Sequence, residues 1–287
     1  MITDVITAPF MDYAFMRRAL AASIILSLGS TPLGVFMTLR RMTLVGDAMS
    51  HAILPGVALS FVAFGLALLP MTLSGLLAGV LVAFIAVILT RVTQLKEDAS
   101  FTMLYLISLA TGVTIISLKG SSIDLLHMLF GNILAIDENS LLLIAGVTCI
   151  TLCVLAAFYR GLVLECFDPD FTRASTYGRT WTGQIFFILL VLNLIAAFQA
   201  LGTLMALGLM ILPAIAAKFW TRNIDTTIPV SIVIALVSSF AGLLFSYYEA
   251  VPSGPAVILV AGGITLASVF FGRCGSVASY FLANDTY

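Results

Sequence analysis

Asp47 and His51 are the residues of this 287-residue chain whose types and spacing could do chemistry. They stand four residues apart at the head of an apolar run, "GDAMSHAILPGVALSF". On a helix this spacing places two side chains on one face, about 5–6 Å apart. A carboxylate oxygen with a neutral imidazole nitrogen suits zinc, manganese, iron or cobalt and suits magnesium or calcium poorly. We therefore interpret the pair as two ligands of one metal ion.

Two other interpretations of the pair stay open at this point. Asp47 could cap the start of its helix after Gly46, and His51 could be a satisfied core histidine. Against both stands the cost of an ionisable group at membrane depth, about 2.5–3.5 kcal/mol on insertion scales, which is usually retained for function. No other long apolar run of the chain carries His, Asp or Glu. Further ligands would come from water, Ser50, carbonyls near Pro55, or a second copy of the chain about a two-fold axis.

The composition places these residues in a membrane protein. The chain is 61% hydrophobic and only 9% charged, with a mean hydropathy of +1.15, so a water-facing surface cannot be built from it. A spanning helix takes about 20 mostly apolar residues. We expect an all-α, polytopic membrane protein of about eight or nine transmembrane helices in one domain, 1–287. The nine candidate spans are 17–39, 47–69, 71–90, 100–118, 140–159, 183–200, 202–220, 228–248 and 255–272.

Small residues indicate how these spans pack. Gly75 and Gly79 form a small-xxx-small pair that favours close helix packing. A further group is expected to interrupt the first span: Gly29, Ser30, Pro32 and Gly34. Interrupted spans beside an ionisable pair are typical of a transport path.

The positive charges predict the orientation of the chain in the membrane. With nine spans, ten of the thirteen Lys and Arg residues fall on one side, and only Arg17, Arg18 and Lys119 fall on the other. Because Lys and Arg in short loops stay on the cytoplasmic side, we expect the N-terminus outside the cell membrane and the C-terminus in the cytoplasm.

Two connections are too long to be simple turns. The outer one, 119–140, contains an amphipathic stretch, "IDLLHMLFGNIL", that could receive a partner. The inner one, 160–183, mixes acids and bases, and Asp168 is placed to cap a short helix, 170–177, that Gly178 closes. The alternative for the inner connection is a solvated loop without a role of its own.

Several classes of protein are excluded or disfavoured. A net charge of −1 gives no basic surface for nucleic acid, and the four cysteines form no CxxC pair that would indicate a zinc knuckle. The chain has no H-E-x-x-H sequence, and the pair lacks a nearby nucleophile, so an enzyme is not expected. It also has no G-x-x-x-x-G-K-[ST] sequence, so any ATP that drives it must bind another subunit.

The sequence resembles the permease subunits of zinc and manganese ABC importers, the metal-ion ABC-3 family. The resemblance is carried by "LRRMTLVGDAMSHAILPGVAL" and continues in "DLLHMLFGNILAI", "LVLECFDPDFTRASTYG", "LGTLMALGLMILPAIAAKFW" and "PSGPAVILVAGGI", in the family's order. It covers nearly the whole chain. It implies an ATP-driven importer of manganese, zinc or iron that works by alternating access as a homodimer beside two ATPase subunits.

The resemblance also implies roles for particular residues. Asp47 and His51 would line a transient metal site; no tightly bound cofactor is implied, because the metal is the cargo. Residues expected to dock on the cytoplasmic ATPase are Glu165, Asp168, Pro169, Asp170, Arg173, Ala174, Tyr177 and Gly178, and residues expected to face an extracytoplasmic metal-binding protein are Asp124, His127 and Asn132. His127, Arg173 and Tyr177 depart from the family's usual pattern, which leaves the individual contacts open.

Two rival functions remain. Asp47 and His51 could form a proton relay in a secondary metal transporter or channel, or they could be structural residues in a membrane scaffold. Proton coupling would predict uptake that follows the pH gradient without an ATPase.

Overall fold

The computed structural model describes residues 9–65, 67–93, 95–118, 136–167 and 181–277, and within them regular structure is helical throughout. The long elements are α2 (Ala14–Leu39), α3 (Thr43–Ala52), α4 (Leu54–Phe64), α5 (Leu68–Val92), α6 (Glu97–Leu118), α8 (Glu138–Phe167), α10 (Trp181–Leu201), α11 (Thr203–Lys218), α12 (Ile224–Glu249) and α13 (Ser253–Phe271). The predicted all-α membrane fold is confirmed.

The apolar runs form helices that are long enough to cross a bilayer. Seven of them are at least 18 residues long, the second combining α3 and α4, and two shorter apolar helices, Thr182–Phe198 and Leu204–Lys218, lie within α10 and α11. In α5 the exposed apolar side chains recur every three or four residues, as on one face of a helix: Leu73, Leu77, Leu81, Phe84 and Ile88. This face of α5 is suited to lipid or to another apolar chain.

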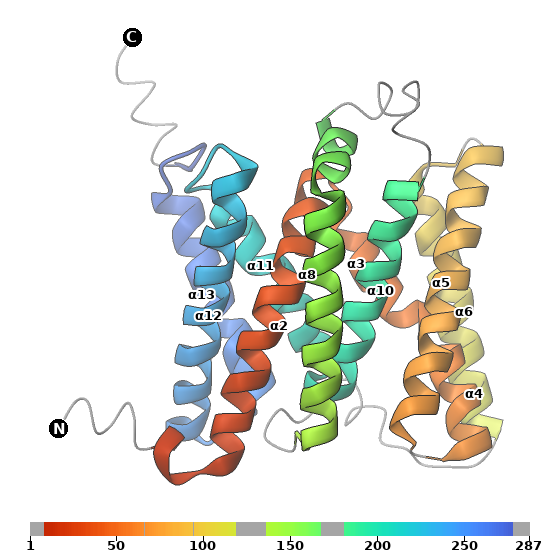
Figure 1. Cartoon of the computed structure of the whole chain (residues 1–287), viewed down its shortest axis with the longest axis horizontal. Helices are drawn as coiled ribbons and strands as arrows, with labels where there is room; N and C mark the ends of the chain where they lie inside the picture. The colour runs from red at the N-terminus through yellow and green to blue at the C-terminus, as the bar shows by residue number, and fades with distance from the viewer. Residues whose placement is uncertain (1–8, 66, 94, 119–135, 168–180, 278–287) are drawn as a thin grey trace.

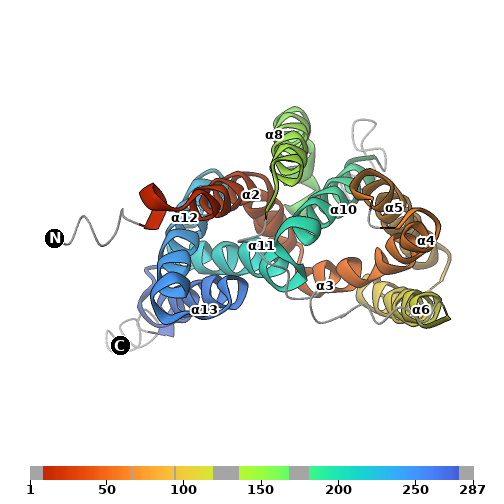
Figure 2. The same ribbon diagram turned by 90° about the horizontal axis from the view of Figure 1, so that it is seen from below.

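The helices form an elongated bundle in which α2 lies between α12 and α8 (Figure 1). Seen along the helices, α12 and α13 lie at one end of the bundle and α4, α5 and α6 at the other, with α10 and α11 between them (Figure 2). Helix α2 packs against α8, α11 and α12. The start of α2 lies on the lower side of the bundle and the end of α13 on the upper side, as seen in Figure 1.

The interruption of the membrane helices lies in the second span and not in the first. Helix α2 runs unbroken through Pro32, so the expectation of a break there was wrong. The second span is divided at Ile53, between α3 and α4. Pro55 explains the division, because it has no N–H to donate to the carbonyl of His51 one turn earlier. The break therefore comes directly after the Asp47 and His51 pair.

Helix α8 is longer than its apolar run predicts. The inner connection was expected to begin at residue 160, but α8 continues through Phe167. Its other end is capped, since the Ser140 amide donates to Asp137 Oδ1 at 3.0 Å, and this contact with Ser140 lowers the pKa of Asp137. Eight residues assigned to the inner loop thus belong to the helix.

Glycines allow close approach at several helix crossings. A Cβ at Gly34 would collide with the backbone carbonyl of Met210 on α11. The predicted Gly75 and Gly79 pair also packs closely: a Cβ at Gly75 would lie 2.8 Å from Ile53, and one at Gly79 would meet Val191. Small residues here let the backbones approach, as in other membrane bundles.

Three buried serine hydroxyls of α2 are satisfied inside the helix. Ser23, Ser27 and Ser30 each donate to the carbonyl four residues earlier, at 2.8, 2.6 and 2.6 Å. A contact between helices is made beside Gly29, where Thr148 of α8 donates to the Ile25 carbonyl at 3.2 Å. These three serines thus occur within the bundle without leaving their donors unpaired.

Candidate functional site

Asp47 and His51 both lie on α3, one helical turn apart. Asp47 Oδ1 and His51 Nε2 are 3.8 Å apart, which is too long for a hydrogen bond and short enough for both atoms to reach one ion. The Asp47 side chain is 59% exposed and that of His51 is 23% exposed. Asp47 is the fifth residue of α3, whose N-cap is Met42, so Asp47 does not cap the helix.

A tight backbone turn fixes the start of α3. The Met42 amide donates to the Met37 carbonyl at 3.0 Å, and Arg41 has a left-handed φ of 59°, which together close the end of α2 in a Schellman arrangement. Only three residues, 40–42, separate the two helices. The position of Asp47 is therefore tied closely to the end of α2.

The opposite face of α3 is anchored in the bundle. Val45 and Met49 are buried, and a Cβ at Gly46 would lie 2.9 Å from Met37 Cε and 3.3 Å from Leu207. Gly46 therefore lets α3 approach α2 and α11 closely. Because successive residues of a helix point about 100° apart, this packing turns Asp47 away from the core and toward the exterior of the chain.

The His51 ring is held by an aromatic neighbour. The ring centroid of Tyr105 on α6 lies 5.9 Å from that of His51, with the planes tilted by 32°. His51 Nδ1 is buried and has no hydrogen-bond partner among the described residues. The interpretation of His51 as a fully satisfied core histidine is therefore not supported by the geometry.

The described residues of one chain do not complete a metal site. Nowhere in 9–65, 67–93, 95–118, 136–167 and 181–277 do three His, Cys, Asp or Glu side chains gather. The nearby Ser50 hydroxyl donates to the Asp47 carbonyl at 2.7 Å. The pair offers one hard oxygen donor and one imidazole nitrogen, and the exposed Asp47 leaves room for ligands from outside the chain.

Comparison with known proteins decides the family. The model of the "ABC 3 transport family" matches residues 12–272, which is most of the chain. The chain belongs to the ABC 3 transport family. Among its relatives, the manganese import system permease protein ScaB of Streptococcus gordonii is 33% identical, covering 90% of this chain and 92% of the relative. The manganese transport system membrane protein MntC of Halalkalibacterium halodurans is 29% identical, covering 91% and 88%.

A solved structure supports the same assignment. The chain resembles PsaBC from Streptococcus pneumoniae, in complex with Fab, with a TM-score of 0.84 and 30% sequence identity. The match covers 98% of this chain and 100% of that one. The ABC 3 family is a family of transport permease subunits, so the expected class of this chain, a multi-pass membrane permease, is confirmed.

Most of the other family residues fall outside the described part of the chain. This holds for all the expected binding-protein contacts, Asp124, His127 and Asn132, and for the expected ATPase contacts Asp168, Pro169, Asp170, Arg173, Ala174, Tyr177 and Gly178. Glu165 is described. It lies in the last turn of α8, is 26% exposed, and forms an ion pair of 3.0 Å with Arg40 at the end of α2.

The sequence did not predict the contacts that the charged residues of this ABC 3 chain make with side chains of other helices. Tyr105 and the pairing of Arg40 with Glu165 were not anticipated. In the sequence, Arg40 and Glu165 are visible only as charged residues near the ends of apolar runs. Such a residue predicts where a helix ends, but it does not predict which residue of another helix it contacts. A Tyr159 hydrogen bond to Asp225, which joins α8 to α12, was missed for the same reason.

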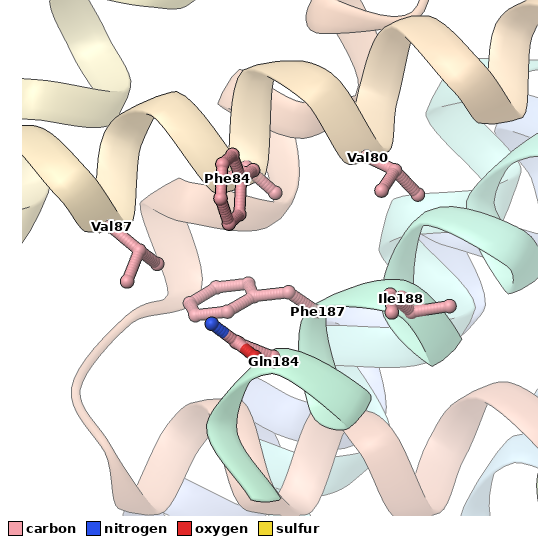
Figure 3. Close-up of a pocket in the computed structure, with 7 residues that line it drawn as sticks. Val80, Phe84, Val87, Gln184, Phe187 and Ile188 are labelled. Carbon is pink, nitrogen blue, oxygen red and sulfur yellow. The ribbon is translucent and has the colours of Figure 1, made fainter. Parts of the chain in front are cut away.

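An apolar recess lies between α5 and α10, and neither Asp47 nor His51 lines it (Figure 3). Its lining comes from Val80, Ala83, Phe84, Val87, Gln184, Phe187 and Ile188. Gln184 is the polar member of this set, and the set includes no acid or histidine. The recess is therefore not suited to bind a metal ion.

Proposed function

We propose that this chain is the membrane-spanning subunit of an ATP-driven importer that carries a divalent transition metal by alternating access. The observation that carries the proposal is the pair of Asp47 and His51, 3.8 Å apart on a short helix that ends beside a break in its span. Manganese is the first candidate, because the relatives ScaB and MntC are named for manganese transport. Zinc and iron fit the same donor atoms.

Asp47 and His51 would bind the ion transiently. Two protein ligands hold a metal more weakly than a closed four-ligand site, and passage requires release as well as binding. Water, or the same two residues of a second copy, would supply the other ligands. The exposure of Asp47 supports a two-fold arrangement of this kind, in which the site lies on the axis of a homodimer.

The other proposed components are a cytoplasmic ATPase subunit and an extracytoplasmic metal-binding protein. The chain has no P-loop sequence, so ATP hydrolysis is assigned to a separate subunit that contacts Glu165 and the segment ending at Gly178. The metal-binding protein would meet the outer segment 119–140. We place the complex in the cell membrane, with the N-terminus of this chain outside and its C-terminus in the cytoplasm.

The test is element-resolved metal accumulation in cells that express the chain with its ATPase and binding protein. Loss of even an outer-shell partner typically costs about 10–100-fold in metal affinity. We therefore expect Asp47→Asn and His51→Ala each to reduce accumulation of one metal by at least about tenfold, while the complex still assembles. The control is Asp98→Asn, which removes an exposed acid on α6.

Accumulation by both variants at the wild-type level would contradict the metal site. Uptake that follows the pH gradient in the absence of the ATPase would instead favour the proton-relay alternative. Cross-linking that placed the two residue-47 positions of the assembled complex far apart would exclude a shared site on the two-fold axis.

A further inference from the structure

Arg40 contacts both of the helices that flank the proposed ATPase-docking segment. Its guanidinium forms an ion pair of 3.0 Å with Glu165 in the last turn of α8. The central carbon of the guanidinium, Cζ, lies 4.7 Å from the ring centroid of Phe186, near the start of α10. Helix α8 ends at Phe167 and α10 begins at Trp181, so the chain between them is the segment expected to dock. A planar guanidinium can pair with a carboxylate and stack on an aromatic ring at once.

The surroundings of Arg40 are packed. The Arg40 side chain is only 10% exposed. One turn earlier on α2, the buried Phe36 makes edge contacts with Tyr159 of α8 at 6.1 Å and with Phe186 of α10 at 6.5 Å between ring centroids. A Cβ at Gly183 would lie 2.7 Å from Glu165 Oε1, so α10 and α8 approach closely beside the ion pair. A shift of either flanking helix would therefore move the end of α2.

Arg40 is also close in the chain to the proposed metal site. It is the C-cap of α2, and Asp47 follows seven residues later on α3. The connection is the tight turn at Arg41 and Met42, whose amides bond back to α2. Such a turn transmits displacement, because it contains no long flexible loop in which movement could be absorbed.

We propose that Arg40 is a positioning residue that couples the ATPase-docking segment to the metal site. Through Glu165 and Phe186 it makes α3, with Asp47 and His51, follow movements of α8 and α10. This inference rests on the proposed function and adds to it the route by which ATP-driven movement reaches the ion.

The test measures Mn²⁺ transported per ATP hydrolysed by the complete complex, with its ATPase and binding protein, in proteoliposomes. We expect Arg40→Gln and Glu165→Gln each to lower this ratio by about fivefold or more, the lower end of typical coupling between sites. Hydrolysis continues in both variants. The double variant should be no worse than Arg40→Gln alone, because that substitution already removes the contact with Glu165.

The matched control is Arg18→Gln. Arg18 pairs with Glu138 at 3.1 Å and joins the same two helices, α2 and α8, at their other ends. That pair is exposed, with side chains 45% and 79% accessible, and exposed ion pairs contribute little. We expect the control to keep the wild-type ratio of metal to ATP.

The outcomes separate this inference from the proposed function. If wild type transports Mn²⁺ and Arg40→Gln keeps its ratio, the coupling role is wrong and the importer stands. Additive losses in the double variant would also overturn it, since Glu165 would then act on the ATPase independently of Arg40. If wild type moves no divalent metal, the proposed function fails and the inference with it.

A second pair of variants covers the case in which Arg40→Gln does not assemble. Arg40→Lys keeps the charge but cannot lay a planar group on the ring, and Phe186→Leu removes the ring beneath Arg40 together with its edge contact with Phe36. Each should lower the metal-to-ATP ratio by about half or more while assembly and hydrolysis persist. Wild-type ratios in both would overturn the proposal.

Discussion

At the scale of single residues, the two proposed ligands have unequal surroundings. His51 is mostly covered, with Tyr105 beside its ring, whereas Asp47 is largely exposed. The ring contact restricts the imidazole, whose Nε2 lies 3.8 Å from Asp47 Oδ1. The carboxylate itself has freedom to meet an ion or a second chain. His51 is therefore the more restricted of the two proposed ligands, and Asp47 is the more mobile one.

Tyr105 is therefore predicted to support transport through its ring and not through its hydroxyl. Tyr105→Ala should lower the rate of Mn²⁺ uptake about 2- to 10-fold, because a ring contact of this kind contributes about 0.5–1.5 kcal/mol. Tyr105→Phe is the control and should remain near wild type. Initial uptake rates in proteoliposomes check this, and equal losses in both variants would show that the hydroxyl matters instead.

Much of the candidate site was predictable from spacing, and its surroundings were not. Asp47 and His51 stand out because acids and histidines are rare in apolar runs, and their i, i+4 spacing alone places them on one face. The sequence could not exclude a capping role for Asp47, because the start of α3 depends on the turn at Arg41 and Met42. It also could not name Tyr105 or pair Arg40 with Glu165, because those contacts join residues far apart in the chain.

At the scale of elements, the lengths of apolar runs predicted the membrane helices, but their interruptions depended on packing. Pro32 was expected to break α2, yet neighbouring helices enclose that part of α2 and keep it continuous. The charged end of α8 looked like a loop. It remains helical, and Glu165 there finds its partner on α2. In both cases, contacts with neighbouring helices decide the structure against the preference of the local sequence.

The crossing of α2 and α11 is predicted to tolerate no side chain at Gly34. Gly34→Ala should destabilise the protein by about 1–3 kcal/mol, the usual cost of overpacking, because its Cβ would meet the Met210 carbonyl. Gly146→Ala on α8 is the control, since no neighbouring atom lies within 4 Å of its Cβ position. Thermal unfolding in detergent compares the two, and an unchanged midpoint for Gly34→Ala would contradict the close crossing.

At the scale of the whole molecule, the seven long and two shorter apolar helices of the described residues give an odd number of passes. The described chain therefore starts and ends on opposite sides, as Figure 1 shows for α2 and α13. The count of spans was predictable from hydropathy. The order in which the helices pack was not, because lipid-facing and buried runs have similar composition.

We predict that the C-terminal side of the molecule is cytoplasmic, because ten of the thirteen Lys and Arg residues belong to that side. A fluorescent protein fused after Tyr287 should fluoresce, and alkaline phosphatase fused at the same position should be inactive. Fusions within the outer connection, 119–135, serve as the control and should give the opposite pair of results. Active phosphatase at the C-terminus would reverse the orientation.

The internal bonding of the α2 serines bears on how fast the molecule could change shape. Ser23, Ser27 and Ser30 give their hydrogen bonds to their own helix, so they hold nothing on α8, α11 or α12. Sliding α2 against these neighbours would leave those three bonds intact, whereas the Thr148 bond to Ile25 would have to break. Such sliding would also strain the ion pairs of Arg18 and Arg40 with α8. Along the rest of α2, the barrier between two packed arrangements would be set by the interlocking of side chains.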